Sequence, residues 1–420
     1  MALIKNSFSI ILLFMLIFGF RLPIMYNSAV LALFISIFII FFSKKLRLKM
    51  AYLIKSRYLI RIFSSLILLF IVSVLIPIFH NSNDFTILKG LLGILLTLMI
   101  TLFVYVSISS RLNKKTDIIK YIIIVFFIQS LIQILALVSP SFLSIIQYFQ
   151  PQNVIEIAGS NYYQGLRGLS LSTEQFFGLS TAYGLVIIFY TKYILDERKM
   201  NVPNIMIILI LLTSAFFVGR TVVIGLSFSI LYFIFYAGNV HKLKFIYKIF
   251  MMIVMFSVII FNLLNNELQQ FIVDIILPQV FDIYSNSKAN SSLSRLYEML
   301  SISINEMTFI LGDGLYMKNG HYYMHTDSGY FRQLLYGGMF FVLLNFIYQI
   351  FYFLYGKLYF TTRREKKNFF LFSLLIFLYL SVLHVKGEVI GSGGKMLMVI
   401  LMLYGINVIC FYKKKRIHEN

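Results

Sequence analysis

The fold of this chain is decided by residues 204–238, which read NIMIILILLTSAFFVGRTVVIGLSFSILYFIFYAG. These 35 residues contain one charged side chain, Arg220. A helix needs about 20 apolar residues to cross a bilayer, so the stretch is too long for one span and just long enough for two short ones. It therefore predicts a helical hairpin in a membrane, with Arg220 at the tip where the two helices meet.

The rest of the 420-residue chain has the same apolar character. Charged residues make up 13% of it, whereas about a quarter is usual in soluble domains. Helices suit lipid because they satisfy their backbone hydrogen bonds internally. We therefore predict an all-α polytopic membrane protein that forms a single integral membrane domain over residues 1–420. The expected spans, about twelve, are 6–20, 27–43, 62–79, 86–109, 119–138, 176–191, 203–219, 221–238, 245–264, 330–355, 368–384 and 394–412.

The net charge of +21 is distributed in a way that fixes the orientation. If the N-terminus lies inside, the inner segments hold 27 of the 37 Lys and Arg residues against five acids, which gives +22. Everything else then carries −1. This split follows the positive-inside rule and predicts that both termini are cytoplasmic. Because the basic excess is explained by topology, it indicates no nucleic-acid partner.

Two polar segments interrupt the series of spans, and both are expected on the outer side as periplasmic loops, at residues 139–175 and 265–329. Apolar residues at helical spacing predict an amphipathic surface helix within the second loop. These residues are Leu293, Leu296, Tyr297 and Leu300, followed by Ile302 and Ile304. The same loop concentrates ionisable groups: Arg295, Glu298, Asp313, His321, His325 and Asp327.

Four arginines on the outer side are candidates for binding a phosphate group, because a guanidinium can hold phosphate with two parallel hydrogen bonds. Arg167 lies between glycines before a span, and Arg220 is a charge at membrane depth, which is costly unless it is paired or functional. Arg295 and Arg332 complete the set. The competing interpretations are contact with lipid headgroups for Arg167, a polar hairpin tip for Arg220, a solvated helix face for Arg295 and snorkelling for Arg332.

His325 and Asp327 could provide a general base near neutral pH, and Glu174 is the fallback. His321 is a competing histidine. Together with His325 and Asp327 it nominally supplies three metal ligands, but loop histidines are commonly solvated and no metal is expected. Lys386, Glu388 and Lys395 surround the glycine-rich turn between the last two spans. We interpret that turn as an ordinary flexible connection.

Three motifs in the second outer loop carry a resemblance to a known family. They are SLSRLYEML at 292–300, FILGDG at 309–314 and HTDSGYFRQLLYGG at 325–338. This pattern resembles the large periplasmic loop of Wzy-type O-antigen polymerases and is similar to that of the related O-antigen ligases. Arg167 before a span and Arg220 at a helical hairpin fit the same families.

The resemblance implies a GT-C-like glycosyltransferase of the bacterial inner membrane with a large helical periplasmic loop. Such an enzyme polymerises oligosaccharide repeat units carried on undecaprenyl diphosphate, without metal or cofactor. The four arginines would neutralise the diphosphate, and His325, Asp327 or Glu174 would act on the acceptor hydroxyl. A chain-length regulator and a flippase of the same pathway are the implied protein partners.

Two alternatives remain open. The first is an O-antigen ligase, although ligases usually show His followed by Asn before the span, whereas His325 is followed by Thr326 and Asp327. The second is a lipid-linked oligosaccharide flippase or another transporter. It would need ionisable groups along the spans and no large outer loop, and this chain shows the reverse.

Overall fold

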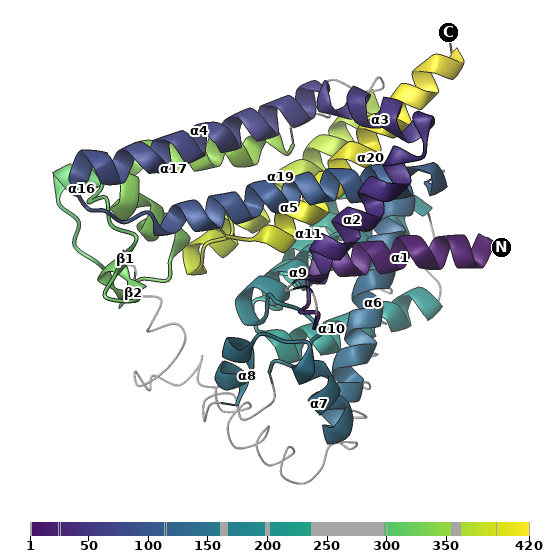
Figure 1. Cartoon of the computed structure of the whole chain (residues 1–420), viewed down its shortest axis with the longest axis horizontal. Helices are drawn as coiled ribbons and strands as arrows, with labels where there is room; N and C mark the ends of the chain where they lie inside the picture. The colour runs from purple at the N-terminus through teal and green to yellow at the C-terminus, as the bar shows by residue number, and fades with distance from the viewer. Residues whose placement is uncertain are drawn as a thin grey trace.

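The computed structural model is an all-α membrane protein whose two ends lie at the same end of a helical bundle (Figure 1). It describes residues 2–23, 25, 27–112, 114, 116–159, 167–197, 202–236, 298–299, 301–353, 363–391 and 393–419. The small hairpin of β1 and β2 lies at the opposite end of the bundle, close to the start of α17 (Figure 1). The two termini and this hairpin therefore lie at opposite ends of the bundle, and the side of the membrane that each faces stays a prediction.

The long helices account for most of the described chain. They are α1 (Ala2–Phe18), α2 (Ser28–Phe41), α3 (Lys44–Ile54), α4 (Arg57–His80), α5 (Thr86–Ile108), α6 (Asp117–Val138), α9 (Phe176–Glu197), α10 (Val202–Val218), α11 (Val222–Tyr236), α17 (Gly329–Phe351), α19 (Arg363–Lys386) and α20 (Lys395–Glu419). Short elements connect them: η1 (Ser109–Arg111), α7 (Pro140–Tyr148), α8 (Gln152–Ala158), α16 (Glu306–Leu311), β1 (Met317–Lys318), β2 (His321–Tyr322) and η3 (Tyr323–His325).

Six helices in the described part of the chain are long and apolar enough to cross a membrane: Arg57–His80, Thr86–Arg111, Asp117–Val138, Phe176–Glu197, Gly329–Phe351 and Glu365–Lys386. The pair α2 and α3 would make a seventh, but it bends by 114°. Ser43 explains the bend, because its side chain accepts the N–H of Leu46 and starts a new helix. The expected span 245–264 lies outside the described residues, so the total of twelve stays a prediction.

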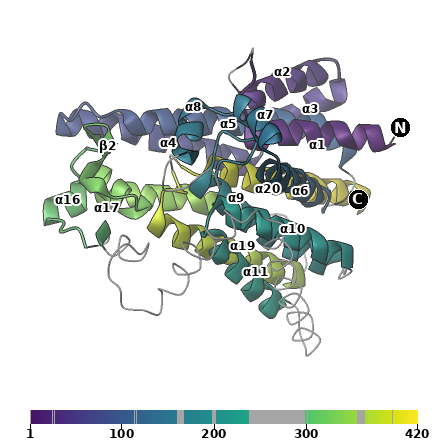
Figure 2. The same ribbon diagram turned by 90° about the horizontal axis from the view of Figure 1, so that it is seen from below.

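The hairpin expected around Arg220 is present as α10 and α11, and it packs against α9. Ser180 on α9 donates a hydrogen bond to the carbonyl of Gly219 at 2.7 Å and accepts one from Thr221 at 2.7 Å. Deeper in the bundle, a methyl group at Gly225 would overlap the backbone of Gly184, so α9 and α11 touch backbone to backbone. Small residues permit such close contact between helices in lipid. Figure 2 shows α10, α11 and α19 gathered beside α9.

The second outer loop differs from the expectation where the structure describes it. Leu293, Leu296, Tyr297 and Leu300 lie outside the described residues. The prediction that the apolar pattern continues as helix is wrong for Ile302 and Ile304, because residues 301–305 are non-helical. Asn305 instead begins a separate helix, α16, by accepting the N–H of Thr308 at 2.7 Å.

An antiparallel hairpin follows α16, with Met317 opposite Tyr322 and Lys318 opposite His321. Its turn is Asn319–Gly320, both with positive φ, the sequence that two-residue hairpins favour. The first outer loop, 139–175, likewise contains the short helices α7 and α8.

The turn between α4 and α5 holds this hairpin against the bundle. The carboxylate of Asp84 accepts the N–H groups of Tyr316 at 2.6 Å and Met317 at 2.7 Å, and Ser82 donates to the carbonyl of Gly314 at 2.6 Å. Burial opposes ionisation of Asp84, but these hydrogen bonds and those from Thr86 outweigh it, so its pKa lies below the ordinary value. The start of the hairpin therefore has a fixed position beside α17.

The topology can be tested by labelling single cysteines in intact cells. In a Cys410→Ser background, a membrane-impermeant maleimide should modify Lys318→Cys on the hairpin and leave Lys366→Cys at the start of α19 unmodified, because the positive-inside rule places them on opposite sides. Lys366→Cys should react only after the membrane is permeabilised. The reverse pattern would invert the orientation.

Candidate functional site

Three cations from separate elements meet at the end of the bundle opposite the two termini. Lys386 at the end of α19 lies within electrostatic reach of both Arg220, at the α10–α11 tip, and Arg167, in the loop before α9. The side chains of Arg220 and Lys386 are exposed, and that of Arg167 is partly exposed. We call Arg167, Arg220 and Lys386 the cation cluster. The structure therefore brings together two of the four arginines selected from the sequence and adds a lysine to them.

Arg167 is held in place through the backbone that follows it. The buried side chain of Gln150 donates hydrogen bonds of 2.6 Å to the carbonyls of Gly168 and Ser170. Gly168 has a φ of +80°, and a side chain there would lie 2.6 Å from the Cβ of Ala158. Only glycine fits this position without strain. The segment that carries Arg167 is thus packed against α8 rather than loose.

The first turn of α9 connects the cation cluster to the rest of the bundle. Phe177 packs against Gly387, the residue after Lys386, while Ser180 contacts the tip that carries Arg220. Phe176, where α9 begins, has a φ of +53°. A bulky residue in this left-handed region costs about 1–3 kcal/mol, and such strain is found most often at functional sites.

Glu174 precedes this turn and faces the start of α20. The backbone N–H of Met396 donates to its carboxylate, and the ammonium group of Lys395 is close enough to interact with it. Burial raises the pKa of Glu174 and outweighs these two contacts, so the group ionises above the ordinary range for Glu. Glu174 is thus a partly buried carboxylate at the start of α20, in the position of a helix cap.

Arg332 has partners within the protein. Its guanidinium lies 4.4 Å from the ring centre of Tyr316 and 3.6 Å from that of Tyr322. It is 3.4 Å from the carboxylate of Glu388, and the hydroxyl of Tyr316 bridges the two groups. The Arg332 and Glu388 side chains are 9% and 4% exposed. The charge of Arg332 is therefore balanced by Glu388, and the arginine neither snorkels nor faces the cation cluster.

The turn between α19 and α20 is packed, so its interpretation as an ordinary flexible connection is wrong. Val389 and Ile390 are each 1% exposed, and Gln333 donates to the carbonyl of Ile390 at 2.8 Å. Gly391 has a φ of +88°, and a side chain there would overlap Asn345. One feature of the sequence could have indicated an ordered turn, namely the three charged residues around so short a connection: Lys386, Glu388 and Lys395.

The remaining candidates are separate from the cation cluster or not described. His325 and Asp327 are exposed, while Thr326 and Ser328 beside them are fully buried. The rings of His321 and His325 have centres 6.0 Å apart. Within the described ranges, these two histidines and Asp327 do not form a three-ligand metal group. Arg295 lies outside the described residues.

Comparison with known proteins assigns no family to this chain. No family model matches it, and neither a curated protein nor a solved structure matches it. A functional assignment therefore depends on the geometry of the outer end of the bundle and on the sequence motifs.

The pairing of Arg332 with Glu388 predicts a large loss of stability in Arg332→Ala. The change leaves a carboxylate buried without a partner, which typically costs about 3–5 kcal/mol. Thermal unfolding in detergent should show a clearly lowered Tm. The exposed Arg363→Ala is the matched control and should leave the Tm unchanged. Combining Arg332→Met with Glu388→Met should recover most of the loss, and an unchanged Tm in Arg332→Ala would show that the pair is not structural.

Proposed function

We propose that this protein is a glycosyltransferase of the bacterial inner membrane that polymerises oligosaccharide repeat units carried on undecaprenyl diphosphate. The product is an O-antigen or capsule-type polysaccharide, made at the periplasmic face. The observation that carries this proposal is the cation cluster of Arg167, Arg220 and Lys386 at one end of the bundle. The sequence motifs that resemble O-antigen polymerases give the reaction its substrate class.

The cation cluster suits a lipid-linked diphosphate in both charge and position. When the acceptor hydroxyl attacks the anomeric carbon, the bond from that carbon to the diphosphate oxygen breaks and negative charge collects on the leaving group. Cations fixed in place before the reaction stabilise that charge most effectively. Arg220 is at the tip of two apolar helices, so a diphosphate bound there would leave its lipid tail in the bilayer beside them.

The acceptor hydroxyl must lose a proton, and three carboxylates or imidazoles are candidates to take it. Glu174 directly precedes the first turn of α9, which contacts the Arg220 tip and Gly387, and burial raises the pKa of its carboxyl, which makes it a stronger proton acceptor than an ordinary Glu. His325 and Asp327 are exposed and follow the hairpin in the chain. We therefore place Glu174 first and give His325 and Asp327 a role in positioning the acceptor.

An O-antigen ligase is the second candidate, because a ligase uses the same lipid-linked donor and would need the same cluster. Deleting the protein and separating the lipopolysaccharide on a gel distinguishes the two. A single-repeat band in place of a ladder supports a polymerase, whereas bare core with free lipid-linked polymer supports a ligase. An unchanged ladder would contradict both. A flippase or transporter would move lipid-linked substrate in vesicles that contain no acceptor sugar.

Arg220→Ala should abolish polymer in the deletion strain, because it removes a cation from the diphosphate site. Arg220→Lys should restore little activity, since an ammonium group is a point charge and cannot grip phosphate with two parallel bonds. The readout is the lipopolysaccharide ladder at matched membrane abundance. Arg363→Ala, an exposed arginine at the other end of the bundle, is the control. A normal ladder from Arg220→Ala would remove this residue from the mechanism.

If Glu174 is the general base, the rate of polymerisation should depend on pH. A base must be ionised, so the rate should rise with pH through the pKa of Glu174, which lies above the ordinary Glu value of about 4.3. Glu174→Gln should remove that rise and lower the rate by about 10²–10⁴. The comparison uses purified protein with lipid-linked substrate, with His325→Ala and Asp327→Asn expected to be milder and the exposed Glu156→Gln as control. Equal profiles for wild type and Glu174→Gln would place the base elsewhere.

A further inference from the structure

A polar cavity of about 230 Å³ lies in the described part of the second outer loop, apart from the cation cluster. Its walls come from the segment before α16, from α16 itself, from the residues that begin η3, and from α17. The lining residues are Ser303, Ile304, Asn305, Thr308, Asp313, Tyr323, Met324 and Leu335. This set joins one carboxylate, three hydroxyls and one amide to three apolar side chains.

The polar groups of the cavity are organised around Asp313. Thr308 donates a 2.6 Å hydrogen bond to one carboxylate oxygen, and the Tyr323 hydroxyl also bonds to this carboxylate. Asn305, which also lines the cavity, uses its side-chain oxygen to cap α16, and its amide NH2 group carries two further hydrogen-bond donors. The carboxylate has two oxygens and about four acceptor positions. It can therefore accept further hydroxyl donors from a ligand.

The cavity is built on a rigid base. The backbone N–H of Asp313 donates to the carbonyl of Leu335 at 2.6 Å, and the N–H of Gly314 donates to that of Tyr336 at 3.0 Å. A side chain at Gly338, in the kink of α17, would overlap the backbone of Ile310 in α16. The wall that carries Asp313 is thus fixed to a membrane helix, as a binding site requires.

The opposite wall is strained. Met324, which lines the cavity, and His325, which follows it, both have a φ of +54°. Two successive non-glycine residues in the left-handed region are unusual, and each costs about 1–3 kcal/mol. Strain of this kind persists where the conformation serves a function. Here it accompanies the segment that sets Tyr323 and Met324 against the cavity.

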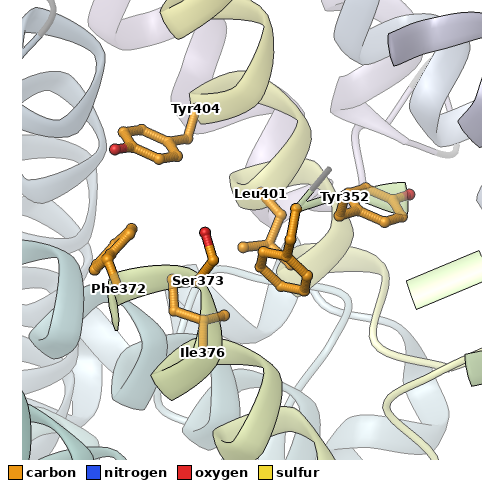
Figure 3. A pocket seen from close by; sticks show the side chains of 7 residues that line it. Tyr352, Phe372, Ser373, Ile376, Leu401 and Tyr404 are labelled. Atoms are coloured by element: carbon orange, nitrogen blue, oxygen red, sulfur yellow. The ribbon is translucent and has the colours of Figure 1, made fainter. Parts of the chain in front are cut away.

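A second hollow, shown in Figure 3, has none of these features. It lies between the end of α17, α19 and α20, among Tyr352, Phe353, Phe372, Ser373, Ile376, Leu401 and Tyr404. It is too narrow to admit a water molecule and almost wholly apolar. It therefore behaves as an imperfection of helix packing, and of these two hollows in the described part of the chain the polar cavity has room for a ligand.

We propose that the cavity around Asp313 is a saccharide subsite that binds one sugar ring of the glycan chain. A carboxylate with neighbouring hydroxyls and an amide matches a polyhydroxylated ring, and Met324, Leu335 and Ile304 match its apolar C–H face. The negative charge of Asp313 disfavours a phosphate, and one carboxylate is too few for a metal. Sites for drug-sized ligands span about 300–1,000 Å³, so this smaller cavity takes a single ring.

The assignment of the ligand class rests on the proposed function, whereas the position of the subsite rests on the cavity. The probe is the free repeat-unit oligosaccharide, released by mild acid from the surface polysaccharide of the native host and carrying neither lipid nor diphosphate. Its Kd is measured by titration calorimetry with the full-length protein in nanodiscs. This binding measurement needs no catalysis.

Asp313→Asn should raise the Kd about tenfold, because hydrogen bonds to a charged group contribute more than neutral ones. Tyr323→Phe removes one hydroxyl and keeps the ring, so it should raise the Kd about threefold to tenfold while preserving the fold. Glu306→Gln removes an exposed carboxylate from α16 outside the lining and should leave the Kd unchanged.

Absence of oligosaccharide binding by the wild type, or equal Kd values for wild type, Asp313→Asn and Tyr323→Phe, would overturn the subsite. A loss as large in Glu306→Gln would overturn it as well. Weaker binding in the two cavity variants supports the subsite even if deletion of the protein leaves the lipopolysaccharide ladder unchanged, a result that would reject the polymerase alone. If deletion of the protein abolishes the ladder but the cavity variants keep the wild-type Kd, the polymerase is supported and the subsite is rejected.

Discussion

The buried ion pair between Arg332 and Glu388 determines how the outer end of this protein is assembled. Removing two charges from water is expensive, and the cost is recovered only when geometry and hydrogen bonds are good. Here the rings of Tyr316 and Tyr322 cover the guanidinium, and the Tyr316 hydroxyl bridges both charges. The pair therefore fixes the loop hairpin, the start of α17 and the turn after α19 relative to one another.

The position of the cation cluster follows from this arrangement. Glu388 is two residues beyond Lys386, so the pair that anchors the turn also sets where the end of α19 stands. The first turn of α9 then connects the end of α19 to Arg220. Phe177 contacts Gly387, and Ser180 contacts the α10–α11 tip. The cation cluster is thus held by residues that do not belong to it.

The sequence predicted the parts of this structure that depend on local composition. The apolar length of 204–238 was enough to predict a helical hairpin with Arg220 at its tip, because lipid imposes the same requirement on any such stretch. The orientation inferred from the basic residues between spans rests on the same kind of local reasoning and stays a prediction. Neither inference needs knowledge of which side chains meet.

The parts that the sequence did not reveal depend on contacts between distant segments. Arg332 and Glu388 are 56 positions apart, and nothing near either residue indicates its partner. The glycines after Lys386 suggested flexibility, although Gly391 is there because Asn345 occupies the space of a side chain. The apolar spacing that predicted helix up to Ile304 was overridden by Asn305, which starts α16 instead.

The contact between Gly184 and Gly225 gives the site an unusual sensitivity to mutation at a distance. Both residues at this contact are glycines, so the separation of α9 and α11 is set by backbone atoms and not by side chains that can change rotamer. A packed side chain can yield by a fraction of an ångström, but a backbone cannot, so a single added methyl group must push the helices apart as rigid bodies. Evolution can therefore vary the exposed surface of α11 freely, while the depth of Arg220 at its start can change only in one abrupt step.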